Sequence, residues 1–161
     1  GAFGLAETLK IPRREAKGII EAYFAEFADL KAYKTRVVEE AKENGYVETV
    51  LGRKRWLPDI TSANAVVRGF AERNAINAPI QGSAADIIKV AMVRIQQALQ
   101  EGGYVAKMIL QVHDELVIEV ASGEREAVEA VVREEMGNAI TLSVPLEVSV
   151  GFGRSWDDAA H

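Results

Sequence analysis

Two apolar runs separated by three polar residues constrain the fold of this 161-residue chain more than any other feature. The first run lies within residues 104–112 and the second within residues 116–120, and both are rich in valine, isoleucine and leucine. Such residues favour strands, and a short polar break between two strands is typical of a hairpin tip. The sequence therefore predicts an antiparallel β-hairpin over residues 104–120, with His113-Asp114-Glu115 at its tip.

Helices are predicted on both sides of this hairpin, because apolar residues recur there at steps of three and four. Three of the predicted helices cover about residues 13–27, about 63–77 and 124–138. A further helix follows the first and ends at Asn44-Gly45, and a long helix follows Pro79 and ends at Gly102-Gly103. Pro79 is expected to interrupt the helix over about 63–77, since proline has no backbone N–H to donate. Ser83 to Asp86 resembles a capping box that would start the long helix.

Two further β segments are predicted. Tyr46–Val50 and Arg53–Leu57 flank a Leu51-Gly52 turn, which indicates a short hairpin. Apolar residues alternate with others over 146–152, which predicts one more strand. The fold class is therefore α+β, with helices followed by an antiparallel β-hairpin, a helix and a closing strand.

Composition excludes several classes of function. The absence of cysteine excludes disulfides and sulfur-liganded zinc, and only His113 and His161 could serve a histidine-based site. A net charge of −5 means that any contact with nucleic acid must be local. No apolar stretch is long enough to span a membrane, and Gly1–Leu5 does not read as a signal peptide. We therefore expect a cytoplasmic protein without membrane partners.

The polar tip of the 104–120 hairpin is the first candidate site. Asp114 and Glu115 are adjacent carboxylates that repel each other, and a divalent cation would relieve the repulsion. Mg²⁺ takes one or two carboxylates and leaves the rest of its shell to water and substrate phosphate. The alternative is an acidic turn in water, although a turn that needed only polarity would more often use Asn-Gly.

Arg73, Asn77 and Gln81 form the second candidate, since they are spaced four residues apart and would lie along one helix face. Their donors suit the acceptors that every base pair shows in the minor groove. Pro79 makes the alignment only approximate. The alternative is a polar helix face in water.

A basic segment forms the third candidate. Arg53-Lys54-Arg55 follows the Leu51-Gly52 turn, and Trp56 comes next. Three cations in a loop can hold phosphates. The alternative is a hairpin tip whose charges only aid solubility.

Taken together, these segments closely resemble the C-terminal part of family A DNA polymerases, the bacterial DNA polymerase I type. The resemblance extends in order along the whole chain. It rests on Gly45–Thr49, Gly52-Arg53, Leu57–Ile60, Ala71–Gly82, Ala84–Lys89, Gln111–Leu116, Val144–Leu146 and Gly153–Trp156. So many matching segments in the same order make coincidence implausible.

The resemblance implies catalytic roles at the hairpin tip. Asp114 corresponds to one of two palm aspartates that bind catalytic Mg²⁺, and Glu115 is its acidic neighbour. His113 and Gln111 would lie near the primer terminus and the nascent base pair. The reaction implied is attack of a primer 3′-hydroxyl on a nucleotide α-phosphate, with two metal ions at the site.

The resemblance also implies contacts with DNA. Arg73, Asn77 and Gln81 would contact the minor-groove side of primer and template, and Arg53 would hold backbone phosphate. Residues 1–45 would be the remainder of the fingers, and residues 46–161 the palm. The partners implied are primer-template DNA, deoxynucleoside triphosphates and the upstream part of the same polymerase.

The resemblance places the second metal-binding aspartate and the nucleotide-binding fingers helix in upstream segments. We therefore expect the chain to be part of a longer polymerase and to be inactive alone. Three rivals are a non-catalytic DNA-binding module, a single-subunit RNA polymerase relative and a metal-dependent hydrolase. The acidic pair disfavours the DNA-binding module, and the Gln111–Glu115 segment disfavours the RNA polymerase relative. The single internal histidine disfavours the hydrolase.

Overall fold

The computed structural model describes residues 1–159, which divide into two compact units. The first unit comprises residues 1–48 and 52–79. The second comprises residues 49–51 and the chain from residue 80 onward. One long helix, α4 (Ala65–Glu101), contributes residues to both units.

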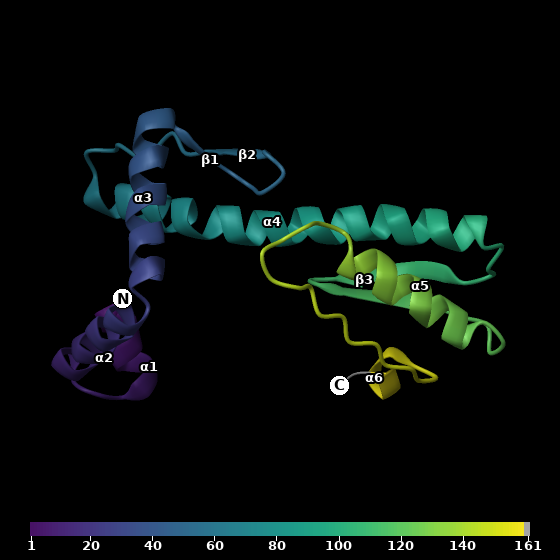
Figure 1. Ribbon diagram of the computed structural model, residues 1–161. Helices are drawn as coiled ribbons and strands as arrows, with labels where there is room; N and C mark the ends of the chain where they lie inside the picture. Colours follow the sequence, from purple (N-terminus) through teal and green to yellow (C-terminus); the bar gives the residue numbers. More distant parts are fainter. Residues whose placement is uncertain (160–161) are drawn as a thin grey trace. The chain divides into compact units, whose positions relative to one another are not determined.

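The first unit is mainly helical (Figure 1). It contains α1 (Ala2–Leu9), α2 (Arg13–Glu26), α3 (Ala28–Asn44), β1 (Tyr46–Glu48), β2 (Lys54–Trp56) and the first part of α4. The predicted helices over 13–27 and up to Asn44-Gly45 are confirmed. Gly45 ends α3 in the left-handed conformation, with φ of 79°, which glycine adopts without strain. Helix α1 was not predicted, and none of its residues is buried.

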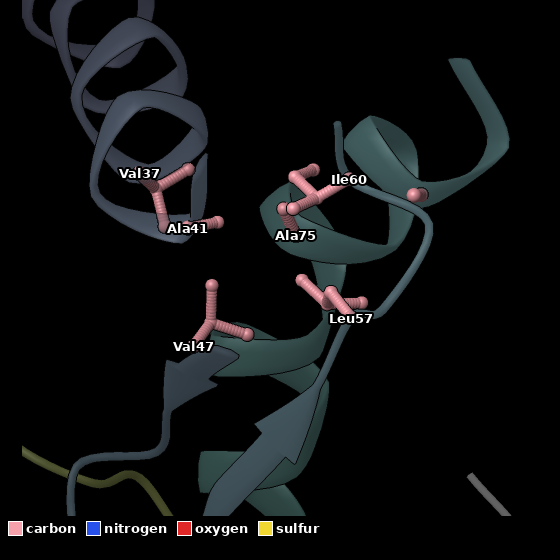
Figure 2. Packing of buried hydrophobic residues seen from close by; sticks show 7 residues of the cluster. Val37, Ala41, Val47, Leu57, Ile60 and Ala75 are labelled. Atoms are coloured by element: carbon pink, nitrogen blue, oxygen red, sulfur yellow. The ribbon is translucent and has the colours of Figure 1, made fainter. Parts of the chain in front are cut away.

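The core of the first unit joins α3, the β1–β2 hairpin and α4. Figure 2 shows Val37 and Ala41 of α3 facing Ala75 of α4, with Val47, Leu57 and Ile60 around them. All of these residues are at most 6% exposed. The short strands are thus held by burial of one face as well as by their ladder.

The β1–β2 hairpin is antiparallel, as predicted. Tyr46 pairs with Trp56 and Glu48 with Lys54, and Val47 pairs with Arg55 between them. The Leu57 N–H donates to the Gly45 carbonyl at 2.8 Å and closes the base of the hairpin.

The predicted break at Pro79 is wrong, because α4 continues through the proline as one helix. Proline removes one hydrogen bond from the preceding turn, but packing on both sides outweighs that loss. Ala71 and Ala75 are buried before it, and Ile88, Ile95 and Leu99 are buried after it. The Tyr33 hydroxyl also donates to the Ile76 carbonyl at 3.3 Å, which ties this part of α4 to α3.

The predicted capping box at Ser83 to Asp86 is therefore also wrong, since no helix begins there. Both side chains instead hold the loop that joins β1 to β2. The Ser83 Oγ accepts the Val50 N–H at 2.8 Å. The Asp86 Oδ2 accepts the Thr49 hydroxyl at 2.6 Å, and Asp86 is only 8% exposed.

The second unit packs two helices on a hairpin (Figure 1). It contains the rest of α4, β3 (Lys107–Val112), β4 (Glu115–Glu119), α5 (Arg125–Gly137) and α6 (Trp156–Ala159). Its core combines Ile95 and Leu99 of α4 with Val128 and Val132 of α5, against side chains of β3 and β4. The predicted hairpin, the stop at Gly102-Gly103 and the helix over 124–138 are confirmed.

The closing strand predicted over residues 146–152 is not formed in the described structure. Leu146, Val148 and Val150 are half-buried and alternate with exposed residues, so the predicted burial pattern exists. No neighbouring strand pairs with them, and the Val148 carbonyl instead accepts a hydrogen bond from the Arg133 guanidinium. Alternation of apolar and polar residues indicates which side chains are buried. A β-strand also needs a neighbouring strand with which its backbone forms hydrogen bonds.

The α+β class itself is confirmed, with helices and antiparallel two-stranded sheets. Among the helices that the structure describes, none is both long enough and apolar enough to cross a membrane.

Candidate active site and nucleic-acid contacts

The turn at the tip of the β3–β4 hairpin contains fewer residues than the sequence predicted. Val112 pairs with Glu115, so only His113 and Asp114 form the turn. Glu115, predicted at the tip, is the first residue of β4. All three polar side chains are exposed, and Asp114 and Glu115 are adjacent at the end of the hairpin.

The turn carries backbone strain at His113, whose φ is 55°. A two-residue hairpin turn with positive φ at its first position normally uses glycine there. A non-glycine residue in this region costs about 1–3 kcal/mol, and such conformations cluster at active sites, although they also end helices, as Lys10 does after α1. The Gln111 side-chain amide donates to the His113 carbonyl at 2.6 Å and helps to hold the turn.

A β-bulge lies between Met108 and Leu110 in β3. The bulge leaves Ile109 without a ladder partner, 59% exposed. Bulges bend a strand and redirect the side chains that follow, and they occur often beside active sites. The bulge and the strained turn therefore lie on either side of the last residues of β3.

The donor set at this tip fits part of a Mg²⁺ shell. Asp114 and Glu115 offer carboxylate oxygens, the ligands that Mg²⁺ prefers, and this ion needs only one or two of them from protein. Within residues 1–159 there is no group of three or more histidine, aspartate or glutamate side chains that could hold a metal ion. The tip can therefore supply ligands to a site, but the described residues do not complete one.

Arg73, Asn77 and Gln81 are all exposed on α4. Arg73 and Asn77 belong to the first unit and Gln81 to the second. The Arg73 guanidinium lies 5.8 Å from the centroid of the Phe70 ring, so its side chain follows the helix surface. Because α4 continues through Pro79, the residues are spaced four apart on a single helix.

The basic segment Arg53-Lys54-Arg55 is exposed on the β1–β2 hairpin. The Lys54 Nζ lies 4.1 Å from the Tyr46 ring centroid and 3.6 Å from the Glu48 Oε1. The hydrogen bond with the Tyr46 side chain, followed by the charge of Glu48, raises the pKa of Lys54 above its ordinary value. Lys54 therefore remains a cation at every physiological pH.

Sequence reasoning missed the side chains that hold these segments in place. Thr49, Ser83 and Asp86 fix the β1–β2 loop, as described above. The Glu124 carboxylate accepts the Val105 N–H at 3.0 Å and the Ala106 N–H at 3.2 Å, just before β3 begins. Asp86 is an acidic residue among apolar neighbours. This pattern could have indicated a buried side chain that forms a hydrogen bond.

Comparison with known proteins gives consistent results. Residues 1–158 match the sequence profile described as DNA polymerase family A. The chain is 59% identical to DNA polymerase I of Mycobacterium tuberculosis over 160 residues, which is 99% of this chain and 18% of that protein. It is 52% identical to DNA polymerase I of Geobacillus stearothermophilus over 157 residues, or 98% of this chain and 18% of that protein.

A solved structure is also closely similar. It is the POL domain of Pol1 from M. smegmatis, in complex with DNA primer-template and dNTP. The TM-score is 0.98 and the identity 56%, over 100% of this chain and 28% of that one. The chain thus spans less than a third of each of these proteins.

Proposed function

The chain belongs to DNA polymerase family A, and on that premise we propose that it forms part of a DNA-directed DNA polymerase. It would contribute the end of the fingers, residues 1–45, and the palm, residues 46–161. The substrates proposed are those named for the M. smegmatis relative, primer-template DNA and dNTP. The complete enzyme would act in DNA replication and repair in the cytoplasm, together with the upstream part of the same polymerase.

The observation that carries this proposal is the strained turn that exposes Asp114 beside Glu115. Asp114 would hold catalytic Mg²⁺, and Glu115 would assist from the neighbouring position. When bound, two such ions stabilise the attacking and leaving oxygens of a phosphoryl transfer. The backbone around Asp114 is held by the ladder pair Val112–Glu115 and by the Gln111 amide, so the turn that carries the carboxylate is formed before substrate arrives.

The remaining site residues would hold the DNA. His113 and Gln111 would lie near the primer terminus, as the family resemblance implies; His113 precedes Asp114 in the turn, and Gln111 contacts the turn from β3. Arg73, Asn77 and Gln81 would donate to minor-groove acceptors. Such hydrogen bonds test the shape of a base pair without reading its sequence. Arg53 would hold backbone phosphate.

The test uses a complete family A polymerase carrying residues 1–161, assayed by single-turnover primer extension. Replacing Asp114 by asparagine preserves size and removes the charge that a metal needs. We expect Asp114→Asn to slow incorporation by about 100- to 1,000-fold, since removal of one main electrostatic contributor costs that much. The affinity for primer-template should remain within about twofold, because Asp114 would not contact the duplex.

Glu115→Gln is the matched control, since it removes the neighbouring carboxylate from the same turn. Its incorporation rate should fall less than that of Asp114→Asn. Wild-type turnover in Asp114→Asn, or an equal loss in both variants, would contradict the roles proposed for this pair.

A further inference from the structure

The outward face of the β1–β2 hairpin carries an aromatic side chain that the described structure leaves exposed. Cross-strand partners share a face, so Tyr46, Trp56, Glu48 and Lys54 all lie on one side of the hairpin. Val47, between them, points to the other side and is buried in the core of the first unit. Trp56 is 66% exposed, although tryptophan is usually well buried.

The rings on this face are held but not stacked. The Tyr46 and Trp56 ring centroids are 5.0 Å apart with an angle of 63° between the ring planes. This edge contact fixes the two side chains, but the face of neither ring is covered by the face of the other. Lys54, held over Tyr46 and beside Glu48, adds a positioned cation next to the pair.

The hairpin that carries this face is anchored at both ends. At its base, Val47 is buried and the Leu57 N–H donates to the Gly45 carbonyl. In its loop, Thr49 and Val50 are held by Asp86 and Ser83. Little conformational freedom is therefore left to lose on binding, which favours a preformed binding surface.

We propose that Trp56, on the outward face of β1–β2, stacks on an unpaired base of single-stranded template, whose phosphates the adjoining cations bind. Aromatic faces beside basic side chains are the usual features of single-strand binding sites. Bases inside a duplex are already stacked on both faces, whereas an unpaired base of a single strand can offer its face to the indole. This inference rests on the proposed polymerase function, because the template ahead of the primer end is the unpaired part of that substrate.

Charge favours nucleic acid over protein as the occupant of this face. Lys54 lies on the same face as Trp56, and Arg53 comes just before it in the loop, whereas Arg55 pairs with Val47 and lies on the other face. A protein surface packed on Trp56 would have to desolvate the Lys54–Glu48 pair, which is partly exposed beside the indole. A single strand of template carries a phosphate at every nucleotide, so it supplies the opposite charge.

The experiment measures equilibrium binding by a complete family A polymerase carrying residues 1–161. The probes are a fluorescent primer-template with an unpaired 5′ template extension, the same duplex with blunt ends, and the extended form with abasic sites in the extension. Trp56→Ala should weaken binding of the extended form by about 5- to 20-fold, which corresponds to the loss of one stacked base. Binding of the blunt duplex should change by less than about twofold, because it offers no unpaired base.

Two matched variants sharpen the test. Trp56→Phe keeps an aromatic face and should retain most of the affinity. Trp156→Ala removes the other tryptophan of the chain, which is 47% exposed, and should leave the difference between extended and blunt DNA unchanged. Wild type should bind the abasic form about as weakly as Trp56→Ala binds the extended form.

Equal losses on extended and blunt DNA would overturn the proposal, because Trp56 would then contact the duplex or support the fold. No loss in Trp56→Ala would also overturn it, as expected if another part of the polymerase covers the indole. Failure of the polymerase function itself would appear elsewhere, as normal incorporation by Asp114→Asn. The two proposals therefore fail in different assays.

Discussion

At the scale of single residues, His113 shows how the site differs from an ordinary acidic turn. Its positive φ costs conformational energy that asparagine or glycine would reduce, yet the chain keeps a histidine beside Asp114. The Gln111 amide holds the same turn from β3. A turn that only reverses the chain would need neither feature, so both support a functional tip.

Tyr33 gives a pH-dependent prediction at the same scale. Partial burial raises the pKa of its phenol above the ordinary value of 10.0. The folded chain therefore retains the proton longer than the unfolded chain, and stability should fall as pH rises from about 10 through the higher folded-state pKa. Below that range, the hydroxyl donates to the Ile76 carbonyl and should contribute about 0.5–1 kcal/mol.

Tyr33→Phe removes both effects while keeping the ring. We expect wild type to be the more stable at pH 8 and the difference between the two proteins to shrink as pH rises above 10. Denaturant unfolding of both proteins across this range measures that difference. A difference that stays constant or widens with pH would show that the buried phenol does not control stability in this way.

At the scale of elements, the sequence predicted what local residue patterns determine and missed what tertiary contacts determine. The ends of α3 and α4 followed from glycine, the β3–β4 hairpin from its apolar runs, and the β1–β2 hairpin from its β-branched and aromatic residues beside the Leu51-Gly52 turn. The break at Pro79 failed because burial on both sides of the proline outweighs one lost hydrogen bond. The strand at 146–152 failed because its residues find a core but no ladder partner.

The candidate site shows the same division. Side-chain chemistry and spacing singled out Asp114, Arg73 and Gln81 from the sequence alone. The reduction of the tip to two residues, with Glu115 inside β4, depends on the register of the ladder and on a bulge. The role of Asp86 as an anchor depends on a loop 37 residues away along the chain. Neither could be read from local spacing.

The anchor between Asp86 and Thr49 leads to a prediction for the β1–β2 hairpin. In a complete family A polymerase carrying residues 1–161, Thr49→Val keeps the side-chain shape and removes the hydroxyl that donates to Asp86. Loss of a hydrogen bond to a buried carboxylate costs about 1.5–3 kcal/mol. The loosened loop should weaken primer-template binding by about three- to tenfold, as measured by equilibrium titration, whereas Thr49→Ser should bind nearly as wild type does.

A double-mutant comparison identifies the route of this effect. If Thr49 acts by positioning the basic segment, adding Thr49→Val to Arg53→Ala should cause little further loss of affinity. If Thr49→Val weakens binding by the same factor in both backgrounds, the loop acts independently of Arg53.

At the scale of the whole molecule, charge and ligand count agree with a contribution to a larger enzyme. The net charge of −5 leaves only local basic segments to attract DNA. The part of the chain that the structure describes has one adjacent carboxylate pair at the hairpin tip and no larger acidic or histidine cluster. The chain spans 18% of the mycobacterial relative, so the proposed activity is that of the complete polymerase.

The central claim is that Asp114 binds the catalytic metal, and a change of ligand atom tests it most directly. The chain contains no cysteine, so Asp114→Cys places a single thiolate in this segment. Sulfur is a poor ligand for Mg²⁺ and a good one for softer ions. In a complete polymerase carrying residues 1–161, we expect Asp114→Cys to be inactive with Mg²⁺ alone. Adding Zn²⁺ or Cd²⁺ should restore part of the single-turnover incorporation, with no such switch in Glu115→Cys. Undiminished incorporation by Asp114→Cys with Mg²⁺ alone would contradict the claim.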